Sequence, residues 1–129
     1  MEYRIVKPED YELVRQFLVE NGWEKRVADK ERFQTMMENA DRTVAAFEGE
    51  RLVGFARALC DGVSNGYIGT VAVAIDFRGR GIGRELVERL IGDDTNITWV
   101  LRAGRGSREF WEKIGFTASN IAMEKTRGT

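Results

Sequence analysis

The stretch that most constrains this chain is an apolar segment followed by an alternating glycine turn and a helical segment. Residues 71–77 read VAVAIDF, residues 78–83 read RGRGIG and residues 84–90 read RELVERL. The first segment predicts a buried strand, and the apolar spacing of the last predicts an amphipathic helix. Three glycines let backbone N–H groups approach a ligand closely. A helix N-terminus adds unpaired N–H groups and the positive end of its dipole, so the turn predicts an anion site, most simply for a phosphate.

The glycine spacing separates this turn from two common nucleotide-binding turns. A dinucleotide-binding turn requires G-x-G-x-x-G, whereas here the glycines alternate at Gly79, Gly81 and Gly83 and neither glycine nor alanine stands at the required third position. A P-loop requires a glycine followed by lysine, and no glycine of this chain is. A nucleotide-binding interaction domain therefore stays only as a third hypothesis. Three arginines add charge-assisted donors suited to phosphate: Arg78, Arg80 and Arg84.

Composition excludes several function classes. The 129 residues suit one domain over 1–129, and the 20 basic and 21 acidic residues nearly cancel, so neither nucleic acid nor a membrane is an expected partner. The chain has no histidine, which excludes histidine-dependent triads and histidine-based metal sites. Its one cysteine, Cys60, cannot form an intramolecular disulfide and suits a reducing compartment. We expect a cytoplasmic protein without a metal.

The remaining segments predict an α/β fold of order βααβββαβαβ. Strands are expected at 3–6, 42–47, 52–59, 67–75, 97–101 and 121–125, with helices between Pro8 and Gly22, from Asp29 to Ala40, over 82–91 and from Ser107 to Gly115. The run over 67–75 is apolar at consecutive positions, which is typical of a central strand covered on both faces. We expect a mixed central sheet of about six to seven strands flanked by four helices.

Two motifs in this arrangement resemble the GNAT superfamily of N-acetyltransferases. Arg78, Gly81 and Gly83 match its acyl-CoA signature, which is glutamine or arginine, two residues, glycine, one residue, then glycine or alanine. The run FWEKIGF over 110–116 is similar to the family's FYEKLGF, with Trp111 in place of tyrosine. The element order also resembles that fold along nearly the whole chain. Residues 52–61 further resemble the small branch that includes plant arylalkylamine (serotonin-type) acetyltransferases.

The resemblance implies where acetyl-CoA, the co-substrate, binds. In the family two central parallel strands splay apart, here 67–75 and 97–101, and the pantetheine arm pairs with the backbone of the first strand. The matching positions are Val71, Ala72 and Val73, and the pyrophosphate would lie on the N–H groups of the turn, at Arg78, Gly79, Arg80, Gly81, Ile82, Gly83 and Arg84. The N–H group of Val73 is the expected donor to the thioester carbonyl. The family also allows a homodimer.

The catalytic half of the reaction is less clearly marked. Three polar groups that family members often use are replaced: the tyrosine by Trp111, an asparagine by Gly104 and a carboxylate by Thr70. Asp61 is a candidate base, although an aspartate in this turn cluster is more often a turn cap. Tyr67 is a candidate acid, or simply a strand aromatic. Trp23 and Trp111 are candidate walls of the acceptor pocket, with core packing at least as common for each.

Two functions of different classes remain. The first is an enzyme that transfers an acetyl group from acetyl-CoA to an amine of a small molecule or peptide, by direct attack in a ternary complex. The second is a catalytically reduced acyl-CoA-binding or regulatory module. Acceptor pockets in the family are built from the first two helices and their linker, which here span 13–40.

Overall fold

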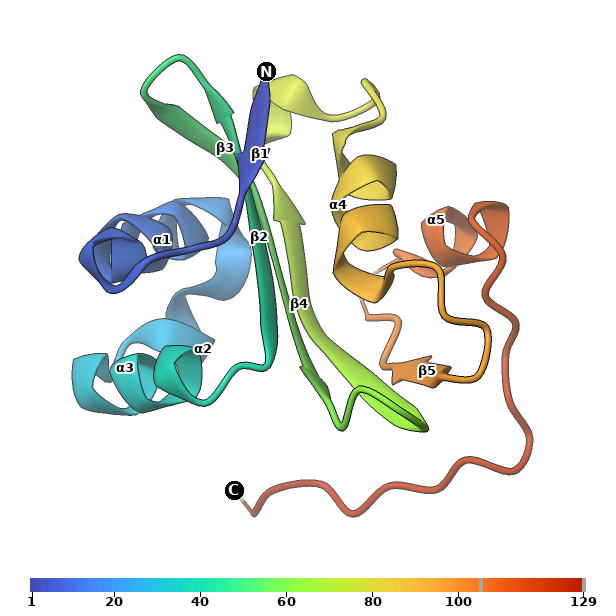
Figure 1. The fold of residues 1–129 in the computed structure, drawn as a ribbon. Coiled ribbons are helices and arrows are strands. Elements are labelled where there is room, and N and C mark those ends of the chain that lie inside the picture. Colours follow the sequence, from blue (N-terminus) through green and yellow to red (C-terminus); the bar gives the residue numbers. More distant parts are fainter. Residues whose placement is uncertain (105, 129) are drawn as a thin grey trace.

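One mixed sheet organises the structure, a computed structural model that describes residues 1–104 and 106–128 (Figure 1). Its strand order is β1-β2-β3-β4-β5. The first four strands pair antiparallel, whereas β4 and β5 are parallel. The strands are β1 (Glu2–Arg4), β2 (Arg42–Glu48), β3 (Arg51–Cys60), β4 (Asn65–Val73) and β5 (Thr98–Leu101).

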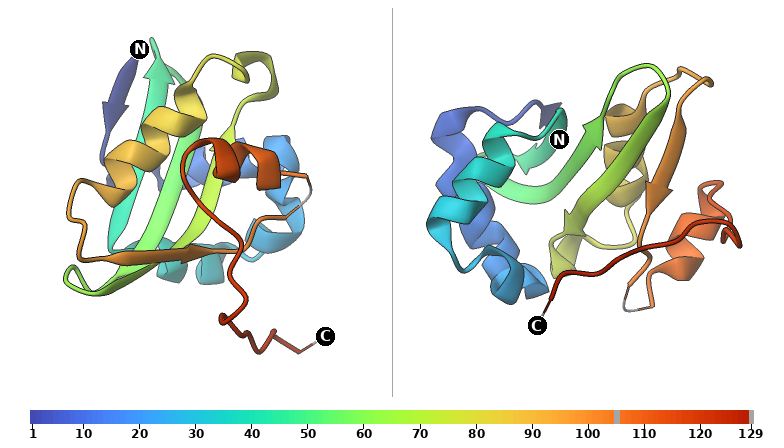
Figure 2. Two further views of the ribbon diagram at one scale, coloured as in Figure 1. Left: turned by 90° about the vertical axis from the view of Figure 1, so that its right-hand side faces the viewer. Right: turned by 90° about the horizontal axis from the view of Figure 1, so that it is seen from below.

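Helices cover both faces of the sheet (Figures 1 and 2). On one face lie α1 (Tyr11–Leu18), the single turn α2 (Glu24–Val27) and α3 (Lys30–Glu38). On the other lie α4 (Ile82–Ile91) and α5 (Arg108–Lys113). Shorter helical turns lie at Pro8–Asp10, Val19–Trp23 and Ile75–Phe77. None of the helices in residues 1–104 and 106–128 is long and apolar enough to cross a membrane.

A buried arginine links helices within the layer formed by α1, α2 and α3. Arg15 of α1 is only 8% exposed, and its guanidinium donates to both carboxylate oxygens of Glu12. The Arg15 guanidinium holds the pKa of Glu12 at about 2, below its usual value. Arg15 Nη1 also donates to the Val27 carbonyl at 3.4 Å, which links α1 to α2. This layer therefore presents a fixed face to the sheet.

The predicted order of elements is confirmed up to α5, but the prediction of a last strand over 121–125 is wrong. Residues 117–128 form neither helix nor strand, and the described chain has five strands rather than six to seven. Ile121 and Met123 are 86% and 96% exposed. A strand needs a neighbouring edge for its backbone hydrogen bonds, and this segment touches the fold through an ion pair from Glu124 to Arg102 instead. Four helices of six residues or more flank the sheet, together with the single turn α2.

Close packing of α4 on the sheet fixes the helix that follows the glycine turn. Gly54 of β3 lies beneath α4, and a Cβ atom added there would lie 2.9 Å from Leu86 Cδ1 and 3.1 Å from Ile82 Cγ2. Leu86 is fully buried. Because Gly54 is the cross-strand partner of Val73, the same contact sets the N-terminus of α4 beside the end of β4.

We predict that Gly54→Val lowers the free energy of unfolding by about 1–3 kcal/mol, because the added side chain overpacks the contact with α4. The matched control is Gly104→Val, at an exposed position where no atom lies within 4 Å of an added Cβ. That change should stay within about 0.5 kcal/mol. Urea denaturation of both variants measures the difference. Equal stabilities would contradict the packing described.

Candidate functional site

The central feature of the site is the place where β4 parts from β5. The two strands pair only from Asn65–Thr98 to Ile68–Leu101, whereas β4 continues to Val73. On its other side β4 stays paired with β3 as far as Val73. Within the described chain, the second half of β4 therefore has a backbone edge that no strand covers. This is the splay predicted for these two strands.

Backbone alternation shows which groups face the gap. The N–H of Ala74 donates to the Val53 carbonyl of β3 at 2.8 Å. Successive residues of a strand turn their backbone groups to opposite sides, so those of Val71 and Val73 point away from β3, toward the uncovered edge. The guanidinium of Arg78 confirms this direction, because its Nε donates to the Val73 carbonyl at 3.2 Å. The gap thus has a donor and an acceptor at two positions for an extended, amide-bearing chain.

The glycine turn lies at the end of this edge, in the conformation that its sequence predicts. Gly79 and Gly81 have φ values of 79° and 83°, a region that favours glycine, and no atom lies within 4 Å of a Cβ added at either. Gly81 caps α4, and the first hydrogen bond of that helix runs from Glu85 N–H to the Gly81 carbonyl at 3.1 Å. The three N–H groups before it, at Ile82, Gly83 and Arg84, have no partner within the helix.

Gly83 joins the turn to the C-terminal run. A Cβ added there would lie 3.1 Å from Phe110 Cε1 and 3.7 Å from Val73 Cγ2. Phe110 packs edge-to-face against Trp111, which does the same with Phe116. The splayed strand, the glycine turn and the FWEKIGF run, which are apart in the sequence, therefore meet at one place.

The three arginines of the turn are exposed and make only local contacts in the described chain. Arg78 reaches the Val73 carbonyl, as described above. Arg80 stacks on Phe77, with 4.5 Å from Cζ to the ring centroid, and donates to the Asp76 carbonyl at 3.3 Å. Arg84 pairs with Glu88 along α4 at 3.4 Å. All three belong to the turn or to the first turn of α4, and their contacts with a phosphate stay a prediction.

Asp61 is engaged in a turn. One of its carboxylate oxygens accepts from the N–H groups of Val63, Ser64 and Asn65, and the other accepts from the Ser64 hydroxyl. These hydrogen bonds hold the pKa of Asp61 far below its usual range. A carboxylate stabilised in its charged form is a poor proton acceptor, so this environment favours a turn cap over a general base.

The aromatic candidates lie on different parts of the fold. Tyr67 is in β4 within the paired region, opposite Val100 of β5, and is 36% exposed. Trp23 ends the turn after α1 and is partly buried. Trp111 is 8% exposed and lies among the aromatic rings of the C-terminal run. Of the three, Tyr67 is the one on the strand that borders the gap.

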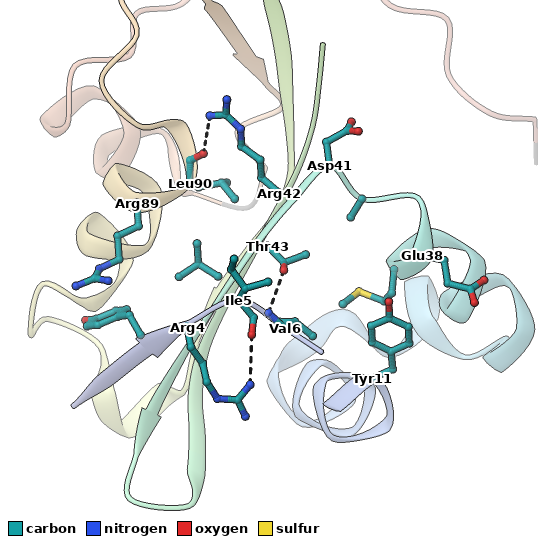
Figure 3. A pocket seen from close by; sticks show the side chains of 14 residues that line it. Arg4, Ile5, Val6, Tyr11, Glu38, Asp41, Arg42, Thr43, Arg89 and Leu90 are labelled. Carbon is teal, nitrogen blue, oxygen red and sulfur yellow. Dashed lines mark hydrogen bonds between the residues drawn. The ribbon is translucent and has the colours of Figure 1, made fainter. Parts of the chain in front are cut away.

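Two pockets lie elsewhere on the fold, and neither is lined by Val71 or Val73. One of about 500 Å³ lies where β1 leaves β2, between Arg89 and Leu90 on one side and Tyr11 and Glu38 on the other (Figure 3). The second, of about 360 Å³, lies between α1 and the end of β4. It is lined by Leu13, Gln16, Phe17, Glu20, Asn21, Glu50, Arg51, Leu52, Ala74, Ile75 and Asp76. Its helical wall belongs to the segment in which we expect the acceptor to bind.

One cation near the gap was missed from the sequence. Arg57 of β3 lies across Gly69 of β4, and its Nε donates to the Thr70 hydroxyl at 3.3 Å. The glycine inside a strand was the only sequence signal for such a close approach.

Among residues 1–104 and 106–128, no three acidic or cysteine side chains come together as a metal site.

Comparison with known proteins agrees with this geometry. The family model of the acetyltransferase (GNAT) domain matches residues 7–127. The PanD regulatory factor of Salmonella typhimurium is 33% identical over 95 residues, which cover 69% of this chain and 74% of that protein. Histone acetyltransferase TAP1 of Glycine max is 40% identical over 76 residues, 55% of this chain but only 32% of that protein.

A solved structure shows the same fold. The GCN5-related N-acetyltransferase of Rhodopseudomonas palustris superposes with a TM-score of 0.77 at 23% identity, over 92% of this chain and 82% of that one. On the match of the family model over residues 7–127, this chain belongs to the GNAT acetyltransferase domain family.

Proposed function

We propose that this chain transfers an acetyl group from acetyl-CoA to an amine of a small molecule or peptide. The observation that carries the proposal is the uncovered edge of β4 beside the glycine turn. Val71 and Val73 offer backbone groups to an extended arm with amides of its own, and the N-terminus of α4 offers N–H groups to phosphates. Pantetheine and pyrophosphate have that chemistry in that order along one ligand.

Each part of the proposed donor site has a separate task. The N–H groups of Ile82, Gly83 and Arg84 hold the pyrophosphate at the positive end of the α4 dipole. Arg78 donates to the Val73 carbonyl in this structure, and its long side chain can donate to a phosphate instead. The Val73 carbonyl would then be free to pair with the pantetheine arm. Because the arm runs from the turn past Val73 to Val71, the N–H of Val71, rather than that of Val73, faces the far end of the arm and donates to the thioester oxygen, where negative charge develops during attack.

The transfer itself uses few side chains. Acetyl-CoA supplies an activated thioester. The neutral amine nitrogen bonds to the acyl carbon, the C–S bond breaks, and the sulfur leaves with the electron pair while the nitrogen gives up its proton to solvent water. A thiol of pKa about 8.5 leaves readily near neutral pH. Tyr67 is our candidate to protonate the sulfur, because it is exposed and lies on the strand bordering the gap.

The alternative is an acyl-CoA-binding module with a regulatory role. It is favoured by the likeness to a protein named PanD regulatory factor, and by the tryptophan where the family often has its tyrosine. Both functions use the same donor site. Release of free thiol from acetyl-CoA across a panel of amines separates them, because a regulatory module binds CoA without turnover on any amine.

The acceptor and the cellular setting are further proposals. The likeness to a histone acetyltransferase supports a peptide amine as the acceptor. The resemblance of residues 52–61 to the arylalkylamine branch supports an aromatic amine instead. Trp23 would then belong to the acceptor wall. A lone cysteine and balanced charge suit the cytoplasm, without nucleic acid or membrane as partners, and homodimerisation stays open.

We predict that Gly81→Asp weakens CoA binding at least about tenfold more than Gly81→Asn. Both residues tolerate a positive φ about equally, so the backbone cost is shared. Only the aspartate adds a negative charge beside the proposed phosphates. Isothermal titration with CoA measures the difference. Position 81 is preferable to 83, where a side chain would also press on Phe110. Equal CoA affinity of the two folded variants would refute the phosphate site.

We predict that Tyr67→Phe lowers kcat by about 10²–10⁴, because the hydroxyl is the proposed general acid, while the Kd for CoA stays the same. Asp61→Asn serves as the comparison. It should lower the melting temperature, since it weakens the turn, but move kcat less than about twofold. Steady-state kinetics and thermal unfolding measure both. A large loss of kcat in Asp61→Asn with an unaffected Tyr67→Phe would reverse the assignment.

A further inference from the structure

The guanidinium of Arg57 lies over the backbone of Gly69 at the point where β4 and β5 separate. A Cβ added at Gly69 would lie 2.8 Å from Arg57 Cζ, closer than real Cβ contacts allow, and 3.2 Å from Nη1, with Nη2 the nearest atom of all. The glycine therefore makes room for the cation. Gly69 is the residue directly after Ile68, the last residue of β4 that pairs with β5.

A bulge produces this arrangement. Arg57 pairs with Thr70 and Ala58 pairs with Ile68, so Gly69 is an extra residue in β4. A bulge bends its strand and re-aims side chains. Here the bulge is the point at which the side chain of Arg57, a residue of β3, lies across β4.

Arg57 differs from the other arginines in its partners. Seven arginines form ion pairs with carboxylates in the described chain: Arg4, Arg15, Arg51, Arg84, Arg89, Arg102 and Arg108. Arg57 is partly buried. Within the described chain its side chain donates one hydrogen bond, from Nε to the neutral Thr70 hydroxyl. Burial lowers the pKa of Arg57, the nearby Tyr67 offsets this only in part, and no carboxylate of the described chain does so. A partly buried cation of this kind is expected to take an anion.

The face on which Arg57 lies is the one opposite α4. Gly54 contacts Leu86 and Ile82 of α4, and residues 54 and 57 of β3 point to opposite faces by strand alternation. The turn and the N-terminus of α4 belong to the α4 face, whereas Arg57 faces the layer of α1, α2 and α3, which Figure 2 shows across the sheet. A donor on the α4 face and an acceptor on the Arg57 face would thus meet at the separation of the strands.

We propose that Arg57 binds a carboxylate on the acceptor, so that the preferred acceptor is an amine that also carries a carboxylate, such as an amino acid. This inference rests on the proposed acetyl transfer, because it assigns the acceptor for that same site. Within residues 1–104 and 106–128, Nη1 and Nη2 donate to no other group, and together they match the two oxygens of one carboxylate. A simple arylalkylamine, which has no negative charge, leaves Arg57 unpaired.

Three matched amines test the proposal: phenylalanine, phenylalaninamide and phenethylamine. They share an aromatic ring and a primary amine, and only the first carries a carboxylate. Thiol release from acetyl-CoA gives kcat/KM for each. We expect kcat/KM for phenylalanine to exceed kcat/KM for phenylalaninamide by about tenfold to a hundredfold, the usual effect of one hydrogen-bonded charge pair. A second series of the same design, alanine, alaninamide and ethylamine, should show the same preference for the acid. The amide has the less basic amine, so chemistry alone would favour it.

Variants assign the preference to Arg57. Arg57→Met should bring acid and amide within about twofold of each other, with CoA affinity unchanged. Arg57→Lys, which keeps the charge but not the two-pronged geometry, should retain part of the preference. Arg89→Met, at an exposed arginine near the end of α4 and outside the proposed donor and acceptor sites, is the control and should keep it all. A wild type that does not prefer the acid, or an Arg57→Met that still does, would overturn the proposal.

A binding measurement separates this proposal from the proposed function. If no amine in either series releases thiol, the acetyl transfer fails, and the thermal shift caused by phenylalanine or alanine in the presence of CoA decides the rest. A shift present in the wild type and lost in Arg57→Met would support the carboxylate site in a binding protein. No shift, or one that both proteins share, would overturn it.

Discussion

The account depends on one constraint, the loss of pairing between β4 and β5 after Ile68. A parallel pair that continued to Val73 would satisfy the backbone groups of Val71 and Val73 and leave no room for a ligand at that edge. Because the strands separate, the edge of β4 is free. The helix that follows is held beside it, since α4 packs on Gly54 so closely that a Cβ would not fit. The gap and the turn therefore form one continuous surface.

Local patterns predicted the parts of this surface that depend on local physics. Alternating glycines require a turn with positive φ at Gly79 and Gly81, and the apolar stripe after them requires a helix, so both could be read from the chain. The close approach of Gly83 to Phe110 was not predicted, because contact between distant segments leaves no local periodicity. The separation of β4 from β5 was implied only by the family resemblance, for the same reason.

Two errors have a common physical cause. Residues 121–125 have the composition of a strand but find no partner edge, and the cation of Arg57 was overlooked because its position depends on a bulge at Gly69. Strand pairing and register are set between segments, not within them. Asp61 is the opposite case: its position in a Gly/Ser/Asn-rich turn already favoured the capping role that its hydrogen bonds now support.

The most direct test of the central claim is a titration of the isotopically labelled protein with CoA, followed through backbone amide chemical shifts. The account predicts the largest changes at Val71 and Val73 of β4 and at the N–H groups of 82–84, with the pocket beside β1 and Arg42 unaffected. Changes confined to that pocket, or a β4 edge that stays silent while CoA binds, would contradict it.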